Sequence, residues 1–148
     1  MLSKITWVVV ISCFIPFIGR SQSIIAVQNA TGASFYQTLN DAITNAVSGD
    51  KIYIPGGNWN LTVPIDKELH IYGVGHDPDS TLATGITSIT ANLNLTTGAD
   101  GGSLNGLKCD YIYFGTSTSN NDVNGYAITR VNAYYIDCLL YTSPSPRD

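Results

Sequence analysis

Three features of the sequence predict an all-β solenoid, a parallel β-helix that begins with a capping α-helix. An amphipathic helical pattern occurs early, over residues 34–48. From residue 51 on, short apolar stretches alternate with Gly, Asn, Asp and Thr, which is typical of strands joined by turns. These stretches recur about every twenty residues, and a repeat of that length built from short strands fits one turn of a β-helix.

The first element, residues 1–23, has the form of a secretory signal peptide. Lys4 lies near its start, residues 5–18 are mostly apolar, and the small residue Ser23 closes the segment. The apolar run is short for a membrane span and Pro16 interrupts it, although an uncleaved anchor is the alternative. We therefore expect a protein that is secreted or held at the cell surface, with no transmembrane segment after signal cleavage.

The charge of the mature chain excludes some partners. The sequence has 44% hydrophobic and 12% charged residues, enough apolar side chains for a packed domain. Residues 24–137 contain four Lys or Arg against ten Asp or Glu, so their net charge is −6. Because nucleic acids and anionic membranes attract basic surfaces, we expect no nucleic-acid partner.

Residues 138–148 differ in composition from the rest of the chain. All eleven residues resemble the translation, in one reading frame, of the transposon-end adaptor DNA used in preparing sequencing libraries. We interpret them as an adaptor-derived, non-native tail; a natural Pro-rich linker is the alternative. On this interpretation Cys109 is the single cysteine of the mature chain, and residues 24–137 are the amino-terminal part of a longer domain.

The helix is predicted over residues 34–48. Apolar side chains from Leu39 to Val47 recur at the spacing of one helical face. Ser34 and Gln37 have the form of a capping box, and Gly49 stands where a helix commonly ends. Residues 24–28 ahead of it have the composition of a short strand.

The strands after the helix are predicted from alternating apolar positions. Five of these stretches each contain a recurrent apolar position: Ile54, Ile71, Ile89, Leu107 and Ile128. The steps between them are 17, 18, 18 and 21 residues. We therefore expect about five coils from residue 51 on, with these side chains stacked in the core. A β-sandwich is the main competing fold, but it does not explain the helix.

Two stretches resemble a known family. The run LNDAITNAVSGDKIYIPGGNW, followed by the pattern Leu-x-Ile-x-Gly-x-Gly over Leu69 to Gly75, is similar to the start of secreted right-handed parallel β-helix proteins of the pectin-lyase-like group. SLNGLKCDYIYF resembles a later coil of that group. The resemblance covers about residues 24–137, and it implies a right-handed coil whose open end is covered by the helix.

The same resemblance implies two kinds of active site, and neither is recognisable. Lyases of the group imply an Arg or Lys base with acidic calcium ligands, and its hydrolases imply clustered Asp residues. Arg130 and Asp110 are the candidates on later coils, but neither has a partner cluster in the sequence. The catalytic residues therefore remain unknown, and we expect no cofactor and no metal. The polar stretch 76–79 is interpreted as a solvated loop, because a calcium site needs more oxygen ligands than it supplies.

Aromatic residues provide the candidate binding site. Tyrosines and one tryptophan recur along the strands, and aromatic faces suit the flat faces of sugar rings. We take Trp59, Tyr111 and Tyr113 as candidate substrate-binding residues; ordinary core packing is the alternative. The function expected is a secreted or cell-surface module that engages extracellular polysaccharide. The alternatives are the amino-terminal part of a polysaccharide lyase or glycoside hydrolase, and the stalk of a surface adhesin. The oligomeric state is left open.

Overall fold

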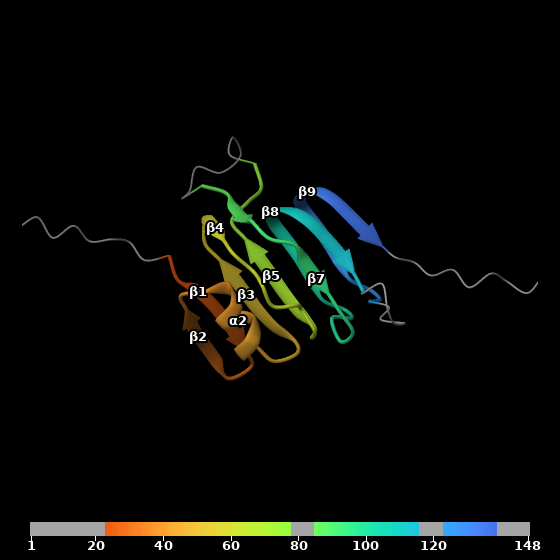
Figure 1. Cartoon of the computed structure of the whole chain (residues 1–148). Coiled ribbons are helices and arrows are strands. Elements are labelled where there is room, and N and C mark those ends of the chain that lie inside the picture. The colour runs from red at the N-terminus through yellow and green to blue at the C-terminus, as the bar shows by residue number, and fades with distance from the viewer. Residues whose placement is uncertain (1–22, 78–84, 116–122, 139–148) are drawn as a thin grey trace, which may run out of the picture.

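The computed structural model describes residues 23–77, 85–115 and 123–138. Over these residues the chain is nearly all β, with one short helix, and its nine strands form a single sheet that is not closed (Figure 1). The all-β class predicted from the sequence is therefore confirmed. The elements are β1 (Ile25–Asn29), β2 (Gly32–Tyr36), α2 (Leu39–Asn45), β3 (Asp50–Ile54), β4 (Gly57–Trp59), β5 (Leu69–Gly73), β6 (Thr87–Ile89), β7 (Leu93–Leu95), β8 (Ser103–Phe114) and β9 (Ala127–Cys138).

The first described elements, β1 and β2, form a hairpin. The two strands pair antiparallel, and β1 also pairs antiparallel with β3. The turn is held by the side chain of Asn29, whose Oδ1 accepts hydrogen bonds from the backbone N–H of Thr31 and of Gly32, both at 2.9 Å. Strand β1 agrees with the short strand expected there, whereas β2 occupies residues assigned to the helix.

Helix α2 is shorter than predicted and begins later. Its N-cap is Thr38, whose hydroxyl oxygen accepts from the N–H of Asp41 at 3.1 Å, and Ser34 lies in β2 instead. The expected stripe is buried at Leu39, Ala42, Ile43 and Ala46, but Val47 lies beyond the helix and is 59% exposed. The helix contacts β1 and β2, at the end of the sheet opposite β9 (Figure 1).

The strands from β3 onward pair in parallel. Strand β8 is long enough to take three shorter partners along one side: β5 pairs with its first part, β6 with its middle and β7 with its last part. Strand β9 pairs with β8 along almost its whole length on the other side. Strands β3 and β5 pair with each other, as do β4 and β6. The parallel pairs therefore form three columns.

The register corrects the predicted repeat. In the first column Ile52 is level with Ile71, Leu104 and Ile128 on successive strands. In the second, Trp59 is level with Ile89 and Cys109. Ile71 and Ile128 are thus equivalent as expected, but Ile54, Ile89 and Leu107 are not equivalent to them. The first column holds four strand segments among the described residues, fewer than the five coils expected.

The core is one cluster of buried apolar side chains. Each column contributes side chains that are almost fully buried, such as Ile71 and Leu104 in the first, Ile89 in the second, and Leu93 and Ile112 in the third. Residues of α2 belong to the same apolar cluster. On β9, Ile128, Val131 and Ala133 are only partly buried, and Ile136, level with Ile112, is 45% exposed. Outward-facing positions of the same strands are therefore the ones that can hold a binding site.

Candidate functional site

Trp59 is placed in the core. It ends β4, is 9% exposed, and its ring N–H donates to the carbonyl oxygen of Pro55 at 3.0 Å. Its level partner is Ile89, a buried residue of the second column. The structure does not bring Trp59 to the surface beside the other two candidate residues, so its ring serves packing.

Tyr111 and Tyr113 come together on the surface of β8. They stand two positions apart, on the same side of the strand, and their rings stack with centroids 6.0 Å apart and an interplanar angle of 11°. Both residues are partly exposed. The sequence therefore identified two neighbouring rings of one surface.

Strand β9 adds two more rings. Tyr134 meets Tyr111 edge to face, with centroids 5.9 Å apart at 75°. Tyr135 is level with Tyr111 in the register, and their ring centroids are 6.4 Å apart. Tyr134 is 83% exposed, the largest exposure among the large hydrophobic residues described. We call Tyr111, Tyr113, Tyr134 and Tyr135 the tyrosine cluster.

The sequence contained Tyr134 and Tyr135 among its recurrent aromatics but did not single them out. Their position beside Tyr111 depends on the register of β8 and β9, which are 24 residues apart at each level pair. A repeat of about twenty residues, as predicted from the sequence, therefore gives the wrong register between these two strands. The consecutive pair Tyr134-Tyr135 late in the chain was the available signal.

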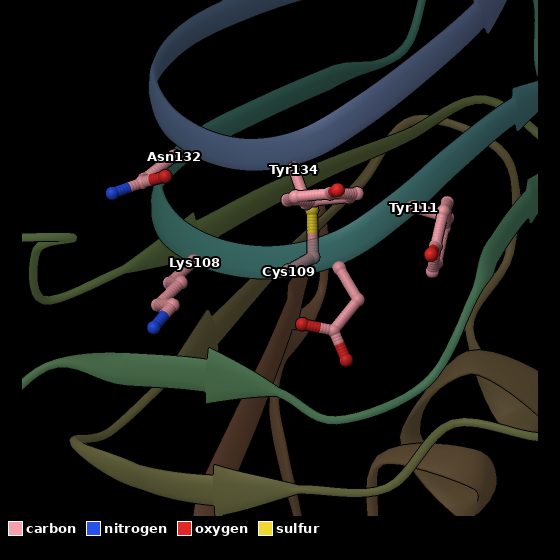
Figure 2. Close-up of a pocket in the computed structure, with 6 residues that line it drawn as sticks. Lys108, Cys109, Tyr111, Asn132 and Tyr134 are labelled. Atoms are coloured by element: carbon pink, nitrogen blue, oxygen red, sulfur yellow. The ribbon is translucent and has the colours of Figure 1, made fainter.

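A shallow hollow of about 510 Å³ adjoins the cluster. Figure 2 shows Lys108 and Asn132 on the two neighbouring strands, with Tyr111 and Tyr134 farther along the same strands. Lys108 and Asn132 are level partners in the register. The lining combines one ammonium, one carboxylate, one amide and two phenol rings, and its residues are Lys108, Cys109, Asp110, Tyr111, Asn132 and Tyr134.

Cys109 does not provide a nucleophile in this hollow. Its side chain is buried, and burial, followed by the negative charge of Asp110, raises the pKa of the thiol to about 12. The reactive form of cysteine is the thiolate, which is negligible near neutral pH at such a pKa. Cys109 is therefore a packing residue beneath the hollow.

Arg130 and Asp110 are not assembled into a catalytic group. The guanidinium of Arg130 donates to Oδ1 of Asn105 through Nε at 3.0 Å and Nη2 at 2.9 Å, and Arg130 does not line the hollow. Asp110 lines it. Within the described ranges, no group of three or more His, Cys, Asp or Glu side chains is arranged to hold a metal ion.

The two charged stretches near residues 66–77 have other surroundings. Lys67 donates to the carbonyl oxygens of Ile43, Thr44 and Ala46 at 3.1–3.3 Å, so it serves the end of α2. His70 bonds the hydroxyl of Ser103 at 3.0 Å and lies 3.7 Å from a carboxylate oxygen of Glu68. Of the polar stretch 76–79, the last two residues lie outside the described ranges.

Comparisons with protein-family models, with curated proteins and with solved structures found no match. Among the described residues, no helix combines the length and the apolar character needed to cross a membrane.

Proposed function

We propose that this chain is a secreted or cell-surface module built as a right-handed parallel β-helix, which binds extracellular polysaccharide through the tyrosine cluster. The observation that carries the proposal is that the ring of Tyr111 contacts the three other rings of the cluster on β8 and β9, next to a hollow with polar side chains.

The β-helix is supported by the three columns of parallel pairs. A chain that passes in turn through three strands, and then returns level with the first, produces such columns. The amphipathic helix beside β1 and β2 would shield one end of the stack from edge pairing. Handedness and secretion rest on the resemblance and on the form of residues 1–23.

The ring contacts and the exposure of the tyrosine cluster support binding of sugar. Contacts with Tyr113, Tyr134 and Tyr135 restrict the ring of Tyr111, so little conformational freedom would be lost when a ligand stacks nearby. Tyr134 leaves most of its surface open to solvent. An open apolar face beside hydrogen-bonding groups suits a sugar ring, which has C–H faces and hydroxyl edges.

The test is binding of the purified chain to a panel of polysaccharides, by affinity electrophoresis and by calorimetry on soluble fragments. We expect Tyr134→Ala to weaken binding at least about tenfold, the effect of losing about 1.4 kcal/mol at one central aromatic contact. Phe35→Ala is the matched control, because Phe35 is an exposed aromatic residue on β2, at the opposite end of the sheet.

Equal loss in both variants, or retained binding in Tyr134→Ala, would contradict the proposed site. Release of shortened or unsaturated sugars from the panel would instead indicate a hydrolase or a lyase. Absence of binding to every polysaccharide would reject the proposed function and leave the structural stalk as the better interpretation.

A further inference from the structure

The hollow beside the tyrosine cluster also indicates which class of polysaccharide it suits. We infer that the site takes a neutral glycan rather than a polyuronate or another anionic chain; this inference rests on the proposed function. The grounds are the balance of charge in the lining, the mixture of donors and acceptors, and the acidity of the whole chain.

The lining carries one positive and one negative side chain. Lys108 and Asp110 both line the hollow and both are exposed. Within the parts of the chain that the structure describes, neither forms an ion pair, so neither charge is neutralised by a neighbouring side chain. A sugar carboxylate drawn to Lys108 would also face the carboxylate of Asp110, and the repulsion would offset the attraction.

The polar groups match hydroxyls better than carboxylates. A sugar hydroxyl both donates and accepts, whereas a carboxylate only accepts. The ammonium of Lys108 donates, the carboxylate of Asp110 accepts, and the amide of Asn132 does both. Lys108 and Asn132 stand level on adjacent strands and point to the same side (Figure 2), so both are available to one ligand.

The charge of the whole chain acts in the same direction. The formal net charge is −4, and a polyuronate repeats a negative charge along its length. Long-range repulsion would slow the approach of such a chain, and a single lysine in the site would not reverse the field. A neutral glycan meets no such barrier.

The experiment compares two forms of one backbone, polygalacturonate and the same polymer with its carboxylates fully methyl-esterified, together with neutral glucan, xylan and mannan fragments. Affinities are measured for the unaltered chain, for Asp110→Asn and for Tyr134→Ala. We expect a neutral probe to bind tightest, with less than about twofold change in affinity between about 0.05 M and about 0.5 M salt.

Asp110→Asn should change the affinities for the two classes of ligand in opposite directions. It removes the negative charge and keeps the shape, so it should weaken the neutral probe severalfold and strengthen polygalacturonate. If polygalacturonate binds the unaltered chain tightest and Tyr134→Ala abolishes that binding, the neutral class is overturned while the proposed function stands. If no probe binds, both are overturned.

Discussion

At the scale of single residues, one position in β8 and one in β9 have a left-handed backbone conformation. Gly106 has φ +69° and Arg130 has φ +50°, and the two residues lie between the paired positions Asn105–Thr129 and Leu107–Val131 of β8 and β9. The left-handed region is costly for a residue with a side chain, about 1–2 kcal/mol. The two Arg130 hydrogen bonds to Asn105 accompany that strained conformation.

Gly106→Ala should lower the free energy of unfolding more than Gly49→Ala does. Both glycines have positive φ, but an added Cβ at Gly106 would lie 2.8 Å from the carbonyl oxygen of Gly73, whereas at Gly49 nothing lies within 4 Å. We expect a loss of about 1 kcal/mol at Gly49 and clearly more at Gly106. Urea unfolding of the two variants measures the difference, and equal losses would mean that the close approach is relieved without cost.

The buried hydroxyl of Tyr126 also affects the stability of the protein. The hydroxyl is buried and finds no hydrogen-bond partner among the described residues, and burial raises the pKa of the phenol. Tyr126→Phe should therefore leave stability at neutral pH unchanged or raise it by up to about 2 kcal/mol, because an unsatisfied polar group is removed. Tyr72→Phe, on a half-buried ring of β5, is the control.

The same burial predicts how the stability of the protein changes with pH in the alkaline range. In the unfolded chain Tyr126 ionises near its ordinary pKa of 10.0, whereas in the folded chain its proton is held to higher pH. Above about pH 10 the unfolded state thus binds fewer protons, and stability falls as the pH rises. Cys109 acts in the same direction between about pH 9 and about pH 12. Tyr126→Phe should flatten this decline; an unchanged slope would contradict the burial of the phenol.

At the scale of elements, α2 depends on a side chain from outside the helix. A seven-residue helix is too short to be stable alone, and its last carbonyls need partners. The ammonium of Lys67 supplies three hydrogen bonds there, and a positive charge at this end also favours the helix dipole.

Lys67→Met should therefore destabilise the protein by about 1 kcal/mol, since the apolar stem is kept and the charged contacts are lost from a partly exposed site. Chemical denaturation followed by circular dichroism measures the effect. Lys51→Met, on the exposed side of β3, should change the midpoint little. A similar shift in both variants would show that the effect is one of net charge, independent of the helix end.

The boundaries of α2 show what local sequence can and cannot predict. The buried stripe from Leu39 to Ala46 was predicted because helical spacing of apolar residues is a local signal. Ser34-x-x-Gln37 and Thr38-x-x-Asp41 both have the form of an N-terminal cap, and the second is used. Pairing of β2 with β1 in a hairpin decides between them, and the helical pattern itself carries no signal for that pairing.

At the scale of the whole molecule, the all-β class followed from period-two patterns, but the register did not. Ile52, Ile71, Leu104 and Ile128 are separated by 19, 33 and 24 residues, because the connections between equivalent strands differ in length. Such unequal steps hide equivalence from any fixed period. The sequence predicted only part of the candidate site. Tyr111 and Tyr113 lie on one strand, so their proximity is local, whereas Tyr134 comes beside them only through the register of β8 and β9.

The position of β8 between its partners has a consequence for the exchange of backbone amide hydrogens with solvent. In parallel pairing, alternate residues of a strand direct their N–H groups to opposite neighbours. Strand β8 has partners on both sides, whereas in the described part of the chain β9 has β8 alone. Amides of β8 should therefore exchange uniformly slowly, and those of β9 should alternate between slow and fast with every residue. Measured by nuclear magnetic resonance in deuterated water, uniform protection along β9 would show that another strand covers its outer side in solution.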